Sequence, residues 1–123
     1  KGQVRVARSN VDLVNTQAEQ GMKDFELNVC KMVRQFNLQH QYVLVASKAD
    51  RTADRRYDVA KRLYILGKST ILDLNSATTE KDAARRNYIS ALKTYWSLYY
   101  GLRSMTGYDF EQNKKIEEVL PEI

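Results

Sequence analysis

Residues able to carry out chemistry are few and isolated in this chain of 123 residues. His40 is the only histidine, Cys30 is the only cysteine, and Glu117 and Glu118 are adjacent carboxylates near the C-terminus. Catalysis needs a nucleophile beside a base, and a zinc site needs about four ligands, so neither pattern is present. The five glycines are scattered singly, without a phosphate-binding loop. The sequence predicts a protein that is not an enzyme and has no cofactor and no metal site.

An aromatic cluster at Tyr95, Trp96, Tyr99 and Tyr100 offers binding chemistry instead. Such side chains can stack on bases or lie at a membrane interface. Tyr95 and Tyr99 are one helical turn apart, as are Trp96 and Tyr100, so packing between helices is the interpretation that we favour.

The charge pattern also favours helices over a nucleic-acid surface. The net charge is +5 and the sequence pI is about 9.4, which raises the expectation of anionic partners only modestly. Asp50, Asp54, Asp58 and Arg62 follow one another at steps of four, amid further basic residues. This spacing is typical of a solvated, ion-paired helix face, so we expect no nucleic acid partner. A basic nucleic-acid module is a weaker alternative, which predicts salt-dependent binding.

Composition restricts the elements that position these residues. Glycine and proline number 5 and 1, too few for the turns of a sandwich, a barrel or an α/β fold. No run of about eighteen apolar residues is present, so we expect no membrane-spanning helix. The chain begins at Lys1 without a methionine or an apolar leader, and we expect it to be a piece of a longer protein or a trimmed form.

The apolar residues predict one long first helix over about 9–63. They recur at steps that alternate between three and four, the heptad rhythm of a coiled coil. Between Val11 and Met22 the steps are three, four and four, which locally unwinds such a seam. The stripe comprises Val11, Val14, Ala18, Met22, Phe25, Val29, Met32 and Phe36, and after Gln39 it resumes with Val43, Ala46, Ala53, Tyr57, Ala60 and Tyr64.

A short break follows, which we place at about 64–70. Gly67 suits the left-handed position that ends many helices. Ser69 or Thr70 can cap the next helix, and Asp73 falls in its first turn, where a negative charge is favourable. Stop and restart signals so close together predict an antiparallel hairpin.

The second helix is expected over about 71–106, with Gly107 as its stop. One stripe comprises Leu74, Ala77, Ala84, Tyr88, Ala91, Tyr95, Leu98, Leu102 and Met105, and an adjoining stripe comprises Ile89, Leu92, Trp96 and Tyr99. Two apolar faces imply neighbours on both sides. The predicted fold is all-α, a long, coiled-coil-like antiparallel helical hairpin over residues 1–110. Residues 111–123 are expected to be an irregular tail, with a short helical turn around 115–120.

The residues of the break resemble the periplasmic tip of the TolC-type outer-membrane efflux family. The match covers RLYILGKSTILDLNSA at 62–77, RNYISAL at 86–92 and LRSMTG at 102–107, and it extends upstream to VRVA at 4–7 and FELNV at 25–29. Ser69 stands where members often carry an arginine, and Asn75 and Ser76 where they often carry an aspartate. The charged gate that the family forms with these residues is therefore not expected in this chain.

This resemblance implies a structural role in transport. Members are trimers whose outer-membrane β-barrel continues into a periplasmic tunnel of helices, and they serve tripartite efflux or type I secretion with a periplasmic adaptor and an inner-membrane pump. We expect this chain to be the last helical hairpin of such a protomer, part of an α-helical barrel, in the periplasmic portion of the outer membrane. Contact with the membrane is then expected only through the barrel, outside this stretch. The expected adaptor-binding residues at the tip are Tyr64, Gly67, Lys68, Ser69, Thr70 and Asp73.

Two alternatives stay open. The same residues can simply close the hairpin, without touching a partner. The chain can also be a helical scaffold or adaptor hairpin that binds partner helices and forms no channel. In either case the second apolar face of the later helix predicts self-association of the isolated chain, as dimers or higher bundles.

Overall fold

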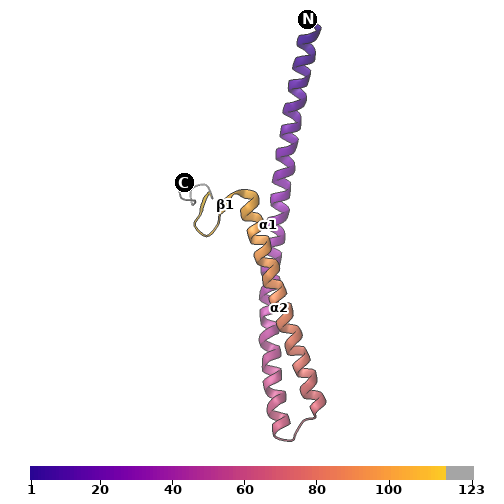
Figure 1. Cartoon of the computed structure of the whole chain (residues 1–123), viewed down its shortest axis with the longest axis vertical. Helices are drawn as coiled ribbons and strands as arrows, with labels where there is room; N and C mark the ends of the chain where they lie inside the picture. The colour runs from indigo at the N-terminus through magenta and orange to yellow at the C-terminus, as the bar shows by residue number, and fades with distance from the viewer. Residues whose placement is uncertain (116–123) are drawn as a thin grey trace.

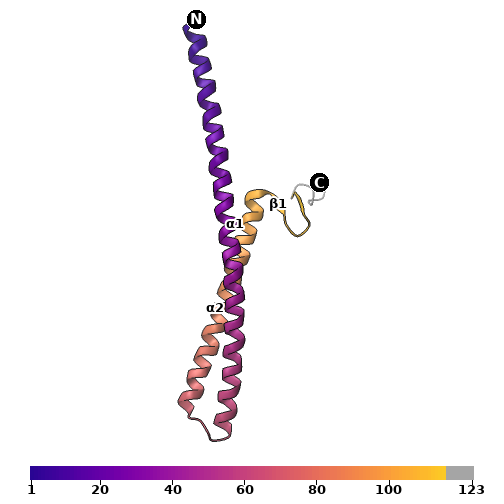
Figure 2. The same ribbon diagram turned by 180° about the vertical axis from the view of Figure 1, so that it is seen from behind.

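Two helices of unequal length fold back on each other in the computed structural model, which describes residues 1–115 (Figure 1). α1 spans Gly2–Ile65 and α2 spans Ile71–Thr106. At about 1.5 Å per residue they are about 96 Å and 54 Å long. The all-α antiparallel hairpin is confirmed, but α1 begins well before the expected start at residue 9. Its N-terminal part extends far beyond the end of α2, as the reverse view also shows (Figure 2).

A narrow seam holds the two helices together. Its positions recur at steps of three and four on both helices, and each of them is buried or half-buried. The most buried apolar residues are small, apart from one leucine near the end of α2, and their small size lets the helix backbones approach closely. They are Ala46, Ala53, Ala77, Ala91 and Leu102.

Polar residues interrupt this seam and connect the helices. Asp50 is only 7% exposed, and its carboxylate lies 3.0 Å from Nε of Arg85, which also lies 3.5 Å from Asp54 through Nη2. Gln39 donates from Nε2 to the carbonyl oxygen of Ala91 at 3.0 Å. A one-turn slip of α2 would break all these contacts, so they fix the register of the hairpin.

The prediction of a solvated, ion-paired face along residues 50–62 is therefore wrong at Asp50. Asp50 lies between Ala46 and Ala53 at seam spacing, so packing against α2 removes its side chain from water. Within residues 1–115, each ion pair of this segment joins a residue of α1 to a residue of α2, and none joins two residues of α1. Asp58 and Arg62 are exposed, as a solvated face requires.

The aromatic cluster lies at the end of the seam that is far from the turn between the helices, and its members have two different environments. Tyr95 stacks on Phe36 with ring centroids 4.9 Å apart, and Tyr99 lies 6.2 Å from the same ring. Trp96 and Tyr100 instead face outward and are exposed. The predicted packing between helices thus applies to the two tyrosines that face α1.

Beyond α2 the chain turns sharply away from the helices. Gly107 has φ of 63°, and β1 (Tyr108–Asp109) pairs antiparallel with β2 (Lys114–Lys115). Asp109 is 3% exposed and anchors this small hairpin, because its carboxylate accepts from the backbone N–H groups of Glu111 and Gln112 and pairs with Arg103 at 3.1 Å.

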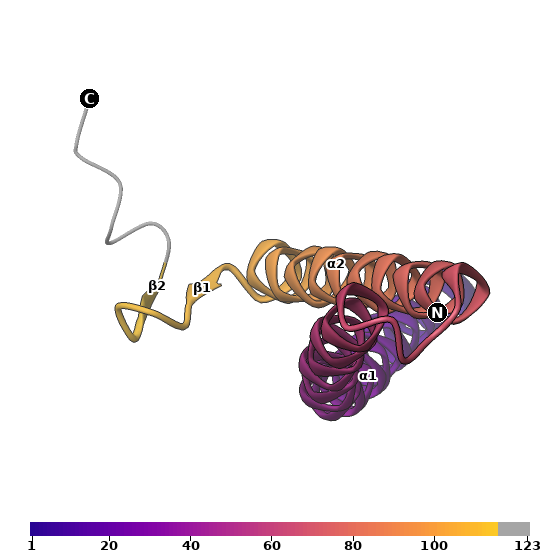
Figure 3. The ribbon, with the colours of Figure 1, turned by 90° about the horizontal axis from the view of Figure 1, so that it is seen from below.

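Figure 3 shows this strand pair projecting to one side of both helices. The prediction of an irregular tail is wrong up to residue 115, because the buried Asp109 organises a turn there. The helical turn expected around 115–120 lies almost wholly outside the described residues. In residues 1–115, no helix combines the length and the apolar character needed to cross a bilayer.

The role of Asp50 in the seam can be tested by removing its partner and then by replacing the ion pair with an apolar pair. Arg85→Ala leaves a buried carboxylate without its closest partner and should lower the free energy of unfolding by about 1–2 kcal/mol. The double variant Asp50→Leu/Arg85→Met should recover this loss, since an apolar pair at a seam position needs no ion pair. Urea unfolding at matched protein concentration measures both. Arg86→Ala, an equal truncation at the next exposed position, is the control; an equal loss there would contradict the assignment.

Candidate partner-binding site at the hairpin tip

The turn that joins the helices is closed by backbone hydrogen bonds around Gly67. The N–H of Gly67 donates to the carbonyl of Tyr64 at 3.0 Å, and the N–H of Lys68 donates to that of Leu63 at 2.8 Å. Gly67 has φ of +70°, the left-handed conformation that favours glycine, as the sequence predicts. These bonds satisfy the last carbonyls of α1 and make the turn a defined structure.

The start of α2 is fixed by a reciprocal cap between Thr70 and Asp73. The N–H of Asp73 donates to Oγ1 of Thr70 at 3.3 Å, while Oδ2 of Asp73 accepts from the Thr70 hydroxyl at 3.0 Å and from the Thr70 N–H at 3.4 Å. The Ser69 hydroxyl donates to the same oxygen at 3.1 Å. Hydrogen bonds from the side chain and backbone of Thr70 and from Ser69 lower the pKa of the Asp73 carboxyl.

The predicted tip residues do not all share one surface. Ser69, Thr70 and Asp73 form the cap, and Lys68, Ser69 and Asp73 line the groove described below. Tyr64, predicted in the turn, lies in the last turn of α1, where its side chain is partly exposed. The break in the helices is accordingly shorter than expected, from Leu66 to Thr70.

An apolar rim around the turn was missed by the sequence-based prediction. Leu66 and Leu72 are 66% and 74% exposed, and Ile65 and Ile71 beside them are exposed too. The signal was present, because the pairs Ile65–Leu66 and Ile71–Leu72 depart from the seam spacing and so have no counterpart in their own hairpin. Large aliphatic side chains around a rigid polar turn are suited to contact with another protein.

A groove leads from the tip up one side of the hairpin. Three cations line it, Arg55, Arg56 and Lys68, beside the apolar side chain of Val59, and the carboxylate of Asp73 lies at its tip end, so the net charge of the lining is positive. Arg56 also reaches Glu80 of α2 at 3.6 Å. The tip and this groove together offer hydrogen bonds, apolar contact and positive charge, which is chemistry for binding and not for turnover.

The remaining candidates for chemistry lie apart from the tip. His40 is exposed, with its ring 5.9 Å from that of Tyr95, and Cys30 is an exposed free thiol. Within residues 1–115, no three His, Cys, Asp or Glu side chains gather in a way that could hold a metal ion. Glu117 and Glu118 lie outside the described residues.

The turn geometry predicts that substitutions at two glycines differ greatly in their effect on the free energy of unfolding. Gly67→Val must force a β-branched residue to φ of +70°, so we expect a loss of at least about 1 kcal/mol in the free energy of unfolding. Gly21→Ala is the matched control, because Gly21 is helical with nothing within 4 Å, and it should stabilise by up to about 1 kcal/mol. Equal effects at both sites in urea unfolding would refute the turn assignment.

The cap predicts a particular response to acid. Because the pKa of Asp73 is lowered in the folded chain, its stabilising contribution is complete above the ordinary value of 3.8. That contribution is lost as the pH falls from this value through the lowered pKa. Thermal unfolding followed from about pH 5 to pH 2 should show a shallower loss for Asp73→Asn than for the natural chain. Asp58→Asn, at another exposed carboxylate, should leave the profile unchanged.

Comparisons with known proteins identify no relative: no family model, curated protein or solved structure matches the chain. The hairpin is therefore established by the structure alone. The resemblance to the TolC-type family depends on the quoted residues, so the role of the tip is a matter for proposal.

Proposed function

We propose that this chain is a helical hairpin of a trimeric outer-membrane channel protein, which serves tripartite efflux or type I secretion, and that its tip contacts a periplasmic adaptor. The observation that carries the proposal is the pair of apolar surfaces left on opposite flanks of the α1–α2 seam. A hairpin that packs only on itself needs one apolar stripe per helix. Each helix here carries a second one.

The first of these surfaces belongs mainly to α1. Leu38, Tyr42 and Val45 are exposed and line a groove with Thr94 and Leu98 of α2. The same stripe continues toward the tip at Thr52 and Val59, where it borders the cationic groove. A neighbouring helix laid in this groove would cover the stripe along most of the hairpin.

The second surface belongs to α2 and lies on the other flank, next to Arg85. Ile89 and Trp96 are exposed on it, at seven-residue spacing, with the half-buried Leu92 between them. A hairpin with one exposed apolar flank on each helix is suited to a wall in which every hairpin has a neighbour on either side. That is the arrangement that a tunnel of helices requires, and it would place the tips together at one end.

The tip supports the adaptor part of the proposal. Its turn is held by the Thr70–Asp73 cap and is surrounded by the exposed Leu66 and Leu72. A pre-ordered surface loses little conformational entropy on binding. The alternative, a helical scaffold that forms no channel, would use the same flanks and the same tip. The experiment must therefore determine both where the protein lies in the cell and whether its tip contacts an adaptor.

The test uses the full-length protein in its own cells. Leu66→Asp and Lys68→Glu at the tip should reduce cross-linking to the adaptor and the export of a test compound by about tenfold or more, with the protein level unchanged. Lys93→Glu, an exposed charge reversal far from the tip on α2, should do neither. Fractionation decides between the two candidates: recovery outside the outer membrane would favour the scaffold, and tip variants with full export would remove the adaptor contact.

A further inference from the structure

Each exposed flank of the hairpin carries a row of side chains at seven-residue spacing. Positions seven residues apart lie on one side of a packed helix, so each row forms a ridge along its helix. The members of both rows are exposed, and they are Leu38, Val45 and Thr52 on α1 and Asp82, Ile89 and Trp96 on α2. Val45 and Thr52 share a hollow with Glu80. Because Glu80 lies about two and a half turns from Ile89, it is on the far side of α2, and the two rows lie on opposite flanks.

The two rows lie at matching heights along the hairpin. Contacts across the seam set these heights, and they join Met32 to Gly101, Asp50 to Arg85, and Arg56 to Glu80. Counted from these contacts along two antiparallel helices, each member of one row is level with a member of the other to within about one turn. The level pairs are Trp96 with Leu38, Ile89 with Val45, and Asp82 with Thr52.

We propose that a second copy of this chain packs beside the first, in the same direction and at the same height, with its α2 row against the α1 row of its neighbour. This inference rests on the proposed function and deepens it by naming the neighbour on each flank. A contact between two different surfaces of one chain repeats from copy to copy, and it closes into a ring when it adds no shift along the axis. Rows at matching heights meet this condition and keep the tips together at one end.

The apolar layers of this contact are complementary in size. The hollow bordered by Leu38 and Leu98 is largely apolar, and it is level with the incoming Trp96. The hollow at the next layer is lined by Ala49, whose small side chain lets the neighbouring helix approach closely at the incoming Ile89. Together these layers would cover the exposed apolar side chains of both flanks.

Charge favours the same direction and height. The incoming Asp82 is level with Thr52, and Arg55 and Arg56 follow within about one turn toward the tip, in the same groove. Within residues 1–115, neither Asp82 nor Arg55 forms an ion pair in its own hairpin. A copy turned end for end about the central layer would instead bring Asp82 to the apolar hollow, where an unpaired carboxylate is costly.

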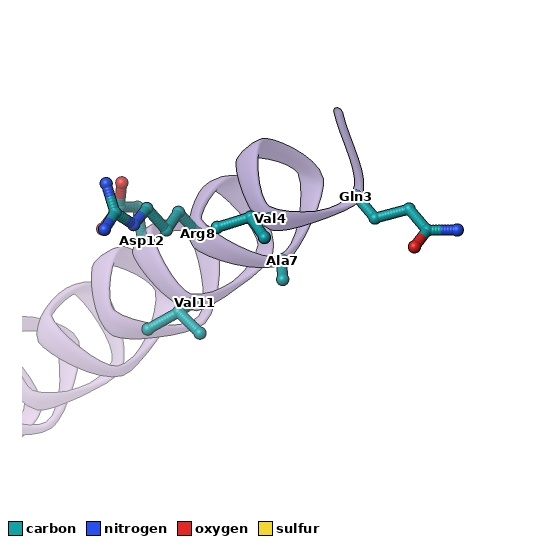
Figure 4. A pocket seen from close by; sticks show the side chains of 6 residues that line it. All are labelled: Gln3, Val4, Ala7, Arg8, Val11 and Asp12. Carbon is teal, nitrogen blue, oxygen red and sulfur yellow. The ribbon is translucent and has the colours of Figure 1, made fainter. Parts of the chain in front are cut away.

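The N-terminal part of α1 is left out of this contact. Its hollow is lined by one helix only, through residues such as Val4, Ala7 and Val11. Figure 4 shows Ala7 and Val11 on one side of the helix and Arg8 and Asp12 together on another. A ridge from a neighbour packs best into a groove between two helices, so the contact is confined to the stretch where α1 and α2 run side by side.

The first test is the mass of the purified chain of 123 residues in solution. Sedimentation equilibrium should give a multiple of 14.3 kDa for the natural sequence. Ile89→Asp places a carboxylate in the central layer and should weaken the association by about tenfold or more. Ser90→Asp introduces the same charge at the next exposed residue, which lies off the row, and should leave the association unchanged. A monomeric natural chain, or equal effects of the two substitutions, would overturn the proposal.

A charge reversal tests the layer nearest the tip. Asp82→Lys sets a cation beside Arg55 and Arg56 of the neighbour, and at low salt it should weaken the association by about tenfold or more. Asp58→Lys makes the same change at an exposed carboxylate outside both rows and is the control. Equal losses in the two variants would show that the rows do not meet at this height.

Disulfide formation tests which surfaces meet, in chains that all carry Cys30→Ser. A mixture of Val45→Cys and Ile89→Cys chains should form the mixed disulfide, while neither chain alone should cross-link, because two different surfaces meet. Leu38→Cys mixed with Ile89→Cys is the control for height: these positions are displaced by about 10 Å along the axis, beyond the reach of about 7 Å between Cα atoms. A cross-linked dimer of one variant alone, or a Val45–Ile89 mixture without the mixed disulfide, would refute the arrangement.

These outcomes are distinct from those that decide the proposed function. A purified chain that stays monomeric removes the second copy as neighbour, whereas the adaptor contact is still decided by the tip variants in cells. A chain that assembles through both rows but is recovered outside the outer membrane keeps this inference and favours the scaffold.

Discussion

The α1–α2 seam is the interaction on which the rest of the structure depends. Two helices about 96 Å and 54 Å long have no compact core, so nearly all their tertiary stabilisation lies along one line of contact. The buried apolar residues of that line are mostly alanines, such as Ala53 and Ala91, which allow close approach but remove little apolar surface each. The hairpin therefore needs its polar contacts for register and its outer faces for further partners.

The spacing of the apolar residues was sufficient to predict the hairpin. Gly67, followed by Thr70 and Asp73, carried the local signals of a helix stop and restart, and these signals depend only on backbone geometry and short-range hydrogen bonds. Features decided by contacts between distant residues were harder to see. Asp50 resembles a surface carboxylate until Arg85 is placed beside it, and Asp109 resembles part of an irregular tail until the backbone N–H groups of its turn are seen to converge on it.

The candidate site was only partly predictable for the same reason. The polar residues of the turn are recognisable because small polar groups cap helices, whatever lies around them. The rim formed by Leu66 and Leu72 becomes apparent once the turn is seen to direct these side chains outward. A sequence with two long apolar stripes does not say which stripe is buried within the chain. The structure resolves this on α2, where Tyr95 faces Phe36 while Trp96 faces outward.

The unequal lengths of the helices decide which surfaces stay unpaired within residues 1–115. An apolar stripe runs the whole length of α1, but α2 covers only the part nearer the tip. The N-terminal part of the stripe lies on the seam itself, so only a helix that occupies the position of α2 can cover it. The flanks lie beside the seam, so they accept neighbours without disturbing it. Hairpins joined through their flanks can therefore stand side by side with their tips at one end, whereas covering the N-terminal part of α1 needs a separate helix.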